Sequence, residues 1–326
     1  MTYHFIGLDL GGTKITAGLT DTDCVLGRKI VLPVDRPEDF EDVVEAMADL
    51  AREVASPLPA PAILGVGVAV SGLVDRESGV VRWSPNLGWR NAPLRAALAR
   101  RLPWDVFVGN DMNLATLGEW SQGAGRGACC LLGVFVGTGI GAGLVLDGRP
   151  YEGAHGFAGA IGHSCSVALH LGQVGECRTL ETWAAGPVLS GRAAEACRTG
   201  EAAVMRPDAG GRVSPEEIGR AEAEGDPAAL RIVGEAAEAL GLAVADASLL
   251  VDPERVILGG GVVRAIPTLV ARVREVVRRR YPQGHAPPEV VAASLGREAP
   301  VVGAAVLVRL GGELRAAARR SRPGDE

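Results

Sequence analysis

Residues 6–18 read IGLDLGGTKITAG, and a second glycine-rich stretch, FVGTGIGAGLVLDG, follows at residues 135–148. Each places a short glycine-rich run between two apolar runs, which is the pattern of a β-hairpin with its turn at the centre. Turns built of Gly-Gly-Thr and Gly-Thr-Gly leave backbone N–H groups uncovered by side chains, so both turns can approach phosphate. Two such turns predict a polyphosphate held between two lobes.

The composition is that of a soluble globular protein. A chain of 326 residues has room for two domains, and 47% hydrophobic with 22% charged residues excludes a disordered chain. The formal net charge of −6 disfavours a nucleic-acid partner, because duplex binding relies on a basic surface. No apolar run approaches the ~20 residues that span a bilayer, and the N-terminus lacks a basic leader. We therefore expect no membrane partner and a cytoplasmic location.

Strand and helix patterns alternate along the chain, which favours an α/β fold with mixed sheets. Apolar residues at spacings of three and four predict a helix over residues 38–55, and strands are expected over 62–70 and 104–108. Asn110 and Asp111 follow the second of these strands, where α/β sheets tend to bind ligands. Further helices are expected over 113–122, 266–280 and 301–320, and a strand and turn over 256–263.

Cysteine usage predicts reduced thiols. The six cysteines include an adjacent pair, Cys129 and Cys130, and none stands in a C-x-x-C spacing. A chain of this length needs no disulfide framework to fold.

Eight short motifs in this order resemble the ROK family of repressors, open reading frames and sugar kinases, within the actin, heat-shock and hexokinase superfamily. The motifs are DLGGTKI (9–15), GVGVAVSGLV (65–74), SPNLGW (84–89), GNDMN (109–113), GTGIGAG (137–143), IGH (161–163), LETWAAG (180–186) and LGGGV (258–262). One glycine motif would be weak evidence, whereas eight motifs in family order are specific.

The resemblance implies a two-lobed ATPase fold with an interlobe cleft. It suggests a small N-terminal lobe over residues 1–112, on which residues 301–320 pack back, a larger lobe over 113–300 and a disordered tail over 321–326. ROK repressors carry a helix-turn-helix segment before the first hairpin. Here the hairpin motif starts at Asp9, which leaves no room for that segment and favours a kinase. A homodimer or homotetramer is also implied.

By the same resemblance, Asp111 is the general base that takes the proton of the acceptor hydroxyl. The residues alone leave another interpretation open, since an Asp at this point can also be the N-cap of the helix that follows. With an ordinary Asp pKa near ~3.9, the carboxylate is a weak base for an alcohol, and proton transfer is expected late in the reaction.

The resemblance assigns ATP and Mg²⁺ to the two hairpins and to a third glycine turn. Asp9 is placed near the metal and the phosphates, although an acid at a strand end is also typical of an ordinary turn. Lys14 could supply a positive charge or be an exposed hairpin lysine, and the third turn could be a simple strand-to-helix connection. The nucleotide-binding candidates are Asp9, Gly11, Gly12, Thr13, Lys14, Gly137, Thr138, Gly139, Gly259, Gly260 and Gly261.

The acceptor candidates are Asn110, Asp111, His163, Glu181 and Gly72. Carboxylates and an imidazole suit the hydroxyl groups of a polyol. For His163 the alternative is a loop histidine bonded to backbone, and for Glu181 it is an acid at a helix start.

The sequence departs from the family pattern at one acceptor residue. Ala160 stands where the family has the glutamate of E-x-G-H, so one acceptor for a ring hydroxyl is missing. A buried hydroxyl without its partner weakens binding by roughly 1–3 kcal/mol, which disfavours glucose itself.

A second departure concerns zinc, because Gly172, Val174 and Thr179 stand at the family's cysteine positions. The family zinc site is therefore expected to be absent. A rearranged site of His163, Cys165, His170 and Cys177 remains conceivable.

These observations predict an ATP- and Mg²⁺-dependent kinase for the primary hydroxyl of a hexose-like substrate: glucose, an amino sugar or a C7-cyclitol. Two other classes stay open. A catalytically silent sugar sensor would keep the fold without turnover, and a chaperone-like ATPase would have no need for His163 and Glu181.

Overall fold

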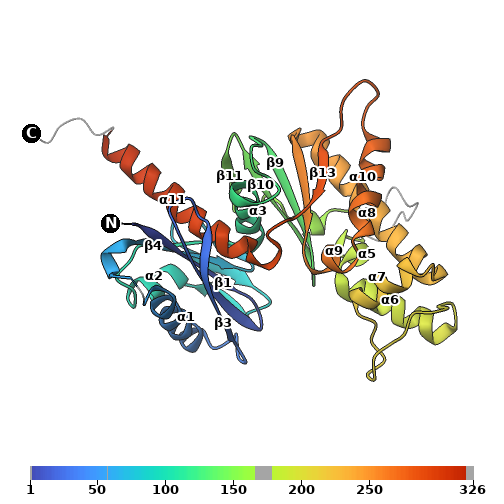
Figure 1. Ribbon diagram of the computed structural model, residues 1–326, viewed down its shortest axis with the longest axis horizontal. Coiled ribbons are helices and arrows are strands. Elements are labelled where there is room, and N and C mark those ends of the chain that lie inside the picture. Colours follow the sequence, from blue (N-terminus) through green and yellow to red (C-terminus); the bar gives the residue numbers. More distant parts are fainter. Residues whose placement is uncertain (1, 57, 166–177, 321–326) are drawn as a thin grey trace, which may run out of the picture. The chain divides into compact units, whose positions relative to one another are not determined.

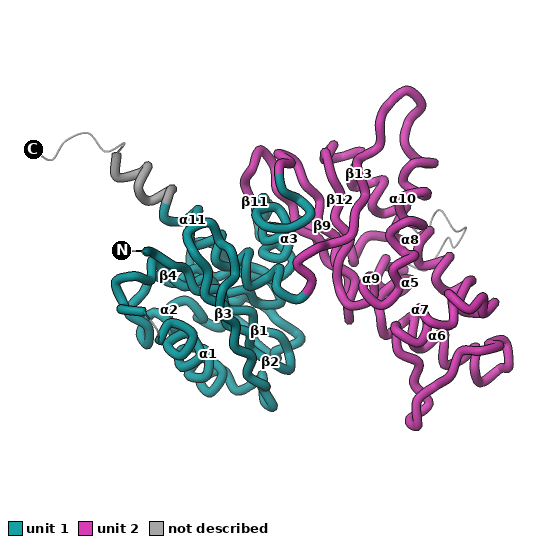
Figure 2. The backbone as a smooth tube through the Cα atoms, in the orientation of Figure 1, with its two compact units in different colours: residues 1–126, 150–158, 297–326 teal, residues 127–149, 159–296 magenta. Residues whose placement is uncertain are grey.

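The computed structural model describes residues 2–56, 58–165 and 178–320 (Figure 1). These residues form two compact units, each with its own hydrophobic core (Figure 2). Unit 1 comprises Met1–Arg126, Pro150–Ala158 and Arg297–Glu326, and unit 2 comprises Gly127–Arg149 and Gly159–Gly296. The expected division at residue 112 does not coincide with this one, since residues 113–126 and 150–158 group with the N-terminal segment.

Unit 1 is built on a five-stranded mixed sheet of order β3-β2-β1-β4-β8. Strand β1 pairs antiparallel with β2, which forms the first hairpin, and parallel with β4, which in turn pairs parallel with β8. The strands span β1 (His4–Leu10), β2 (Lys14–Thr20), β3 (Leu26–Pro33), β4 (Ile63–Val70) and β8 (Val106–Asn110).

Helices cover both faces of this sheet. In Figure 1 the sheet lies between α1 (Phe40–Ala55) and α11 (Ala299–Arg320). Apolar side chains of β1, such as Ile6 and Leu8, pack in one core with the buried face of α1. The unit also contains the short turn η1 (Ala60–Ala62) and α2 (Leu94–Ala99).

Glycines let α11 approach the opposite face and helix α3 (Asp111–Gln122) at backbone distance. A Cβ on Gly7 or Gly67 would lie about 2 Å from a carbonyl oxygen of α11. A Cβ on Gly303 of α11 would lie 1.7 Å from the carbonyl oxygen of Leu114 in α3. This contact explains why α3 belongs to unit 1.

A small antiparallel sheet of three strands, β5 (Leu73–Asp75), β6 (Val80–Ser84) and β7 (Trp89–Ala92), completes unit 1. The sequence patterns did not predict it, because strands of three to five residues are too short to show a period.

Unit 2 repeats the strand order of unit 1. Its sheet runs β11-β10-β9-β12-β13, with β9 antiparallel to β10 in the second hairpin and parallel to β12. The strands of this sheet are β9 (Leu131–Val136), β10 (Ile140–Leu146), β12 (Arg255–Gly259), β13 (Glu289–Ala292) and β11 (Arg149–Tyr151). The last two residues of β11 are grouped with unit 1.

Helices form most of the rest of unit 2. They are α5 (Glu181–Ala184), α6 (Gly186–Thr199), α7 (Pro215–Ala223), α8 (Pro227–Val251), α9 (Gly261–Ala265) and α10 (Thr268–Arg280), with the short turn η2 (Ile161–His163). The short turn η3 (Gly296–Glu298) begins at the last residue of unit 2 and continues into unit 1. Asp226 is the N-cap of the long helix α8. Its carboxylate accepts hydrogen bonds from five backbone N–H groups, those of residues 203, 204, 205, 228 and 229. This single side chain therefore anchors the 203–205 segment to the start of the helix.

The two predicted elements on either side of the β8–α3 junction have boundaries that differ by two residues from the structure. The strand predicted over 104–108 is β8 at Val106–Asn110, because Gly109 and Asn110 still pair with β4. The helix predicted from residue 113 starts at Asp111, since Asn110 supplies its cap.

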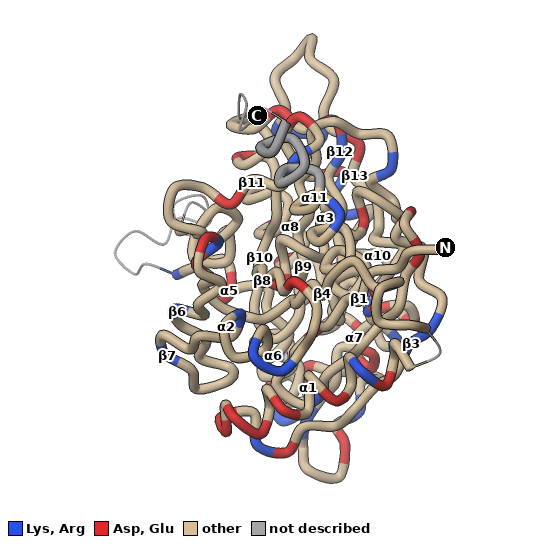
Figure 3. The backbone as a smooth tube through the Cα atoms, turned by 90° about the vertical axis from the view of Figure 1, so that its left-hand side faces the viewer, with Lys and Arg blue, Asp and Glu red and all other residues tan. Residues whose placement is uncertain are grey.

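Lys and Arg residues are interspersed with Asp and Glu residues along the backbone (Figure 3). Among the described residues, no helix combines the length and the hydrophobicity that crossing a bilayer requires.

Candidate functional site

The junction between β8 and α3 holds the predicted base. Asn110 is the N-cap of α3, and its Oδ1 accepts from the N–H groups of Met112 (2.9 Å) and Asn113 (3.1 Å). Its Nδ2 donates to the carbonyl of Gly72 (3.0 Å) and to Oδ1 of Asp111 (3.1 Å). The capping role considered for Asp111 thus belongs to Asn110, and Asp111 is the first helical residue.

Asp111 is a stronger base than its residue type suggests. Burial raises the pKa of Asp111 to about 6, against the lowering effect of hydrogen bonds from Met112 N–H, its own N–H and Asn110. The expected value near ~3.9 is therefore wrong, because sequence alone does not show how far the carboxylate is withdrawn from water. The contacts from Asn110 and Met112 both use Oδ1, so they orient the carboxylate.

Asp9 of β1 lies two strands away from β8, the strand that ends directly before Asp111. It pairs with Ala69 of β4, and Ala69 pairs with Gly109 of β8, two residues before Asp111. Burial and the charge of Asp111 raise the pKa of Asp9 to about 7, while the charge of Lys14 acts to lower it. Two carboxylates that repel each other in a half-buried position fit a divalent cation, which would relieve that repulsion.

The turn after Asp9 presents its backbone. Gly11 N–H donates to the carbonyl of Lys14 (3.0 Å), and the carbonyl of Thr13 accepts from Val34 (2.9 Å). Gly12 and Thr13 are exposed, and a Cβ on Gly12 would have no neighbour closer than 3.8 Å. The turn is thus held at its ends and open at its tip, as an approach to phosphate requires.

In unit 2, the second turn is tied to Glu181. Gly137 N–H donates to the carbonyl of Gly139 (2.9 Å), and Glu181 Oε1 accepts from the N–H of Ile140 (2.7 Å). A Cβ on Gly139 would lie 2.6 Å from this carboxylate oxygen, so a side chain at this position would displace the Glu181 carboxylate. Glu181 does begin a helix, α5, but its carboxylate is bonded to the turn.

His163 follows a glycine that packs against Glu181. It is exposed at the end of η2, and a Cβ on the preceding Gly162 would lie 2.8 Å from Cγ of Glu181. Ala160 directly precedes η2. Unit 2 therefore brings together the second glycine turn, Glu181 and the segment that carries His163.

The third glycine turn lies against the end of β9. Gly260 has φ +93°, a conformation that side chains rarely adopt, and a Cβ there would lie 2.2 Å from the carbonyl of Val136. Gly261 starts α9, so the turn is also the strand-to-helix connection that its sequence allowed. Sequence analysis did not single out Gly186, whose N–H donates to the carbonyl of Gly137 (2.8 Å), although it ends the LETWAAG motif.

The rearranged zinc site falls partly outside the described residues, because residues 166–177 include His170 and Cys177. Within the described ranges, no three side chains of His, Cys, Asp or Glu gather as metal ligands. Cys165 is in a disulfide, which corrects the prediction of reduced thiols at that position, whereas Cys24, Cys129, Cys130 and Cys197 are not disulfide-bonded.

The sequence model of the ROK family matches residues 5–310. The chain belongs to the ROK family. A glucokinase from Thermotoga maritima is 35% identical, covering 94% of this chain and 98% of that protein. A kanosamine kinase from Amycolatopsis mediterranei is 30% identical, covering 94% of this chain and 96% of that protein. A xylose repressor from Caldicellulosiruptor bescii is 30% identical, covering 74% of this chain and 62% of that protein.

The crystal structure of a ROK family glucokinase from Streptomyces griseus, in complex with glucose and AMPPNP, has a TM-score of 0.81 and is 31% identical, covering 94% of this chain and all of that one. The predicted α/β fold with mixed sheets, of the actin-like ATPase type, is confirmed. The enzyme class is that of the ROK sugar kinases, a phosphotransferase with an alcohol acceptor, as predicted.

Proposed function

We propose that this ROK family member uses ATP to phosphorylate the primary hydroxyl of a hexose or hexose-like polyol, with Asp111 as the general base. The carboxylate at the β8–α3 junction carries this proposal, because it is oriented by Asn110 and has a pKa of about 6. A base works best when its pKa lies near the working pH, so Asp111 suits proton removal from an alcohol.

The residues of unit 1 divide the chemistry between orientation and proton transfer. Asn110 holds Oδ1 of Asp111, and its bond to Gly72 ties the pair to the start of β5. Asp111 takes the hydroxyl proton as the oxygen attacks, which produces the neutral carboxyl form. Because burial already favours that form, the carboxylate gains basicity from its position.

The glycine turns and Asp9 fit ATP and Mg²⁺. When bound, these supply the phosphoryl group and neutralise its charge. The open tip of residues 11–13 and the turn of residues 137–139 present backbone N–H groups, and Asp9 offers a carboxylate for the cation. Gly259, Gly260 and Gly261 are proposed to lie against the adenosine. His163 and Glu181 are proposed to bind hydroxyl groups of the acceptor.

The names of the relatives indicate which acceptors to consider. The glucokinases and the kanosamine kinase suggest glucose and an amino sugar, and Ala160 removes an acceptor atom that a glucose hydroxyl would use. C7-cyclitols remain candidates because they share the primary hydroxyl. The homodimer or homotetramer and the cytoplasmic location belong to the same proposal.

The test is a screen of hexoses, amino sugars and C7-cyclitols for acceptor-dependent ADP release. We expect Asp111→Asn to lower kcat by roughly 10²–10⁴-fold while ATP affinity stays within about twofold, because only the base is lost. Asp42→Asn, which removes an exposed acid of α1, is the matched control. Retention of most turnover by Asp111→Asn would remove it from the role of base.

The sensor alternative has one observation in its favour, the similarity to a xylose repressor. Sugar binding without ADP release from any acceptor would support the sensor and contradict the kinase.

A further inference from the structure

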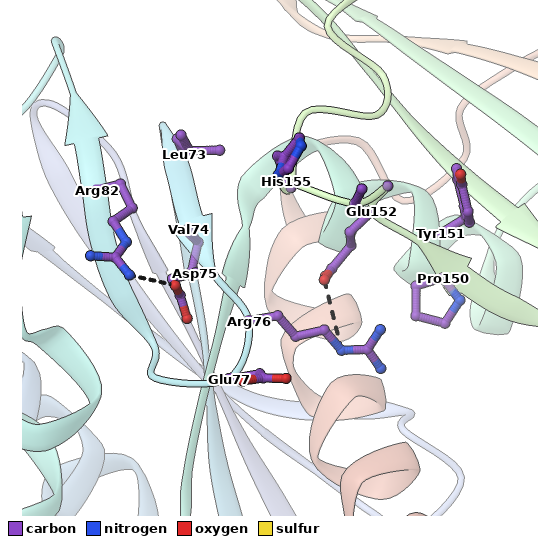
Figure 4. Close-up of a pocket in the computed structure, with 13 residues that line it drawn as sticks. Leu73, Val74, Asp75, Arg76, Glu77, Arg82, Pro150, Tyr151, Glu152 and His155 are labelled. Atoms are coloured by element: carbon purple, nitrogen blue, oxygen red, sulfur yellow. Dashed lines mark hydrogen bonds and ion pairs between the residues drawn. The ribbon is translucent and has the colours of Figure 1, made fainter.

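Unit 1 contains a pocket of about 680 Å³ that no predicted site residue lines (Figure 4). Its walls are β5 with the turn that follows, Arg82 of β6, and residues 150–156. A Cβ on Gly156 would lie 3.0 Å from the carbonyl of Val74, so the two walls are in contact. The volume is in the range of small-molecule sites.

On one wall of the pocket, the carboxylate of Asp75 has its hydrogen-bond partners within the protein. The carboxylate of Asp75 accepts hydrogen bonds from Ser78 N–H (2.9 Å), Ser78 Oγ (2.8 Å) and Arg82 (2.7 Å). These bonds close the turn after β5 and connect it to β6. Asp75 therefore has a structural role, and its acceptor capacity is used.

The opposite wall carries the carboxylate of Glu152, which has hydrogen-bond acceptor capacity left over for a ligand. Only 14% of the Glu152 side chain is exposed, and its nearest cation, Arg76 Nε, is 3.8 Å from Oε2, which is too long for a hydrogen bond. No hydrogen bond to this carboxylate occurs within the part of the chain that the structure describes. Burial raises the pKa of Glu152, and the charge of Arg76 acts to lower it.

Figure 4 shows Glu152 directed toward Arg76, with His155 nearby. The Arg76 side chain is 61% exposed, so most of its charge is hydrated and it neutralises the carboxylate poorly. A ligand with N–H donors and a positive charge would satisfy Glu152 better than the protein does, because hydrogen bonds between charged groups are roughly twice as strong as neutral ones.

The pocket adjoins the proposed base within the same unit. Strand β5 contacts β8, which ends at Asn110. The carbonyl of Gly72 accepts from Asn110, and the next residue, Leu73, lines the pocket. The pocket and the Asn110–Asp111 pair therefore adjoin consecutive residues of one segment, Leu73 and Gly72.

We propose that the pocket receives an amine-bearing part of the phosphoryl acceptor and that Glu152 binds the protonated amine. The substrate class is thus an amino sugar or aminated cyclitol. The inference rests on the proposed function, since it takes Asp111 to mark the reacting end of the acceptor.

The experiment measures kcat/KM for glucose, 2-amino-2-deoxyglucose and 3-amino-3-deoxyglucose with the full chain. For at least one of the two amino sugars, Glu152→Gln should lower the ratio of amine to glucose kcat/KM by roughly tenfold, mainly by raising KM for the amine. Glu152→Asp keeps the negative charge and should retain part of the preference for the amine. Glu77→Gln removes an exposed carboxylate that also lines the pocket and should leave the ratio within about twofold. Circular dichroism melting curves identify any variant that fails to fold.

Equilibrium binding of the same three sugars without nucleotide separates this inference from the proposed function. If glucose is turned over but Glu152→Gln changes neither the amine-to-glucose ratio of kcat/KM nor that of the binding affinities, the amine pocket is overturned and the proposed function is not. Absence of all turnover overturns the proposed function, whereas a tenfold loss of amine binding in Glu152→Gln still supports the pocket.

Discussion

At the scale of single residues, the pair of Asp9 and Asp111 is the chemically active feature of unit 1. Both pKa values are raised by burial, and that of Asp9 also by the charge of Asp111. When both carboxyl groups are ionised, their burial and repulsion destabilise the folded protein, and the same effects make the carboxylates more basic. Perturbed pKa values of this kind are typical of functional sites. The motifs could place both acids near ligand, but their mutual repulsion depends on strand pairing through Ala69, which no local pattern encodes.

The pKa of Asp111 predicts the acid limb of the pH profile. Because the folded-state pKa is about 6, the carboxylate form predominates only above that pH, and kcat/KM for the acceptor should fall as the pH drops through 6. At pH 5 roughly a tenth of the plateau value should remain, whereas an ordinary Asp would retain more than about 90%. The measurement is kcat/KM from pH 5 to 9 at saturating ATP and Mg²⁺, with ionic strength held constant. A profile that is flat down to pH 5 would contradict the raised pKa.

At the scale of elements, the close contact between α11 and α3 decides which glycines can be replaced. A Cβ on Gly303 would lie 1.7 Å from the carbonyl oxygen of Leu114. Because that oxygen belongs to the backbone of α3, the clash can be relieved only if the two helices move apart. Gly312 lies in the same helix with nothing within 4 Å of its Cβ position. Two glycines in one helix thus have opposite roles.

We expect Gly303→Ala to lower the free energy of unfolding by about 1–3 kcal/mol through overpacking. Gly312→Ala should raise it by up to ~1 kcal/mol, because alanine is the better helix former. Urea unfolding followed by circular dichroism measures both. Equal effects of the two substitutions would show that the spacing of α11 and α3 does not depend on Gly303.

The same scale shows what the sequence could predict. Helix α1 was predicted to within two residues because its apolar side chains keep a helical spacing over four turns. The start of α3 was missed, since Asn110 and Asp111 are equally good caps by residue type and only the bonds to Met112 and Asn113 distinguish them. Residues 150–158 belong to unit 1 through contacts with β5 that are distant in sequence, so Glu152 could not be recognised as a pocket residue.

At the scale of the whole molecule, the two sheets share one strand order. In each, an antiparallel hairpin is extended on one side by the next strand of the meander and on the other by two parallel strands. Both proposed phosphate turns therefore occupy the same place in their sheets, at the hairpin between the second and third strands of the order. The two glycine motifs predicted both hairpins, whereas the repeated order of five strands emerges only from long-range pairing.

The repeat predicts which backbone segments respond to nucleotide. Binding of AMPPNP with Mg²⁺ should slow amide hydrogen exchange in peptides that cover residues 11–13, 137–139 and 259–261, because ligand contact protects open turns. Peptides covering the exposed loop 208–212 are the internal control and should not change. Mass spectrometry after timed exchange provides the measurement. Unchanged exchange in the unit 2 turns at saturating nucleotide would contradict their assignment.

The repeat is not symmetrical in its chemistry. Asp9 is the penultimate residue of β1, and the corresponding position in β9 is Phe135, whose ring lies against Gly259. The sheet of unit 1 therefore has a carboxylate at this position, whereas the sheet of unit 2 has an aromatic ring. Only Asp9 can bind a cation, so we expect one equivalent of Mg²⁺ per polypeptide at these two positions, although the same strand order occurs twice.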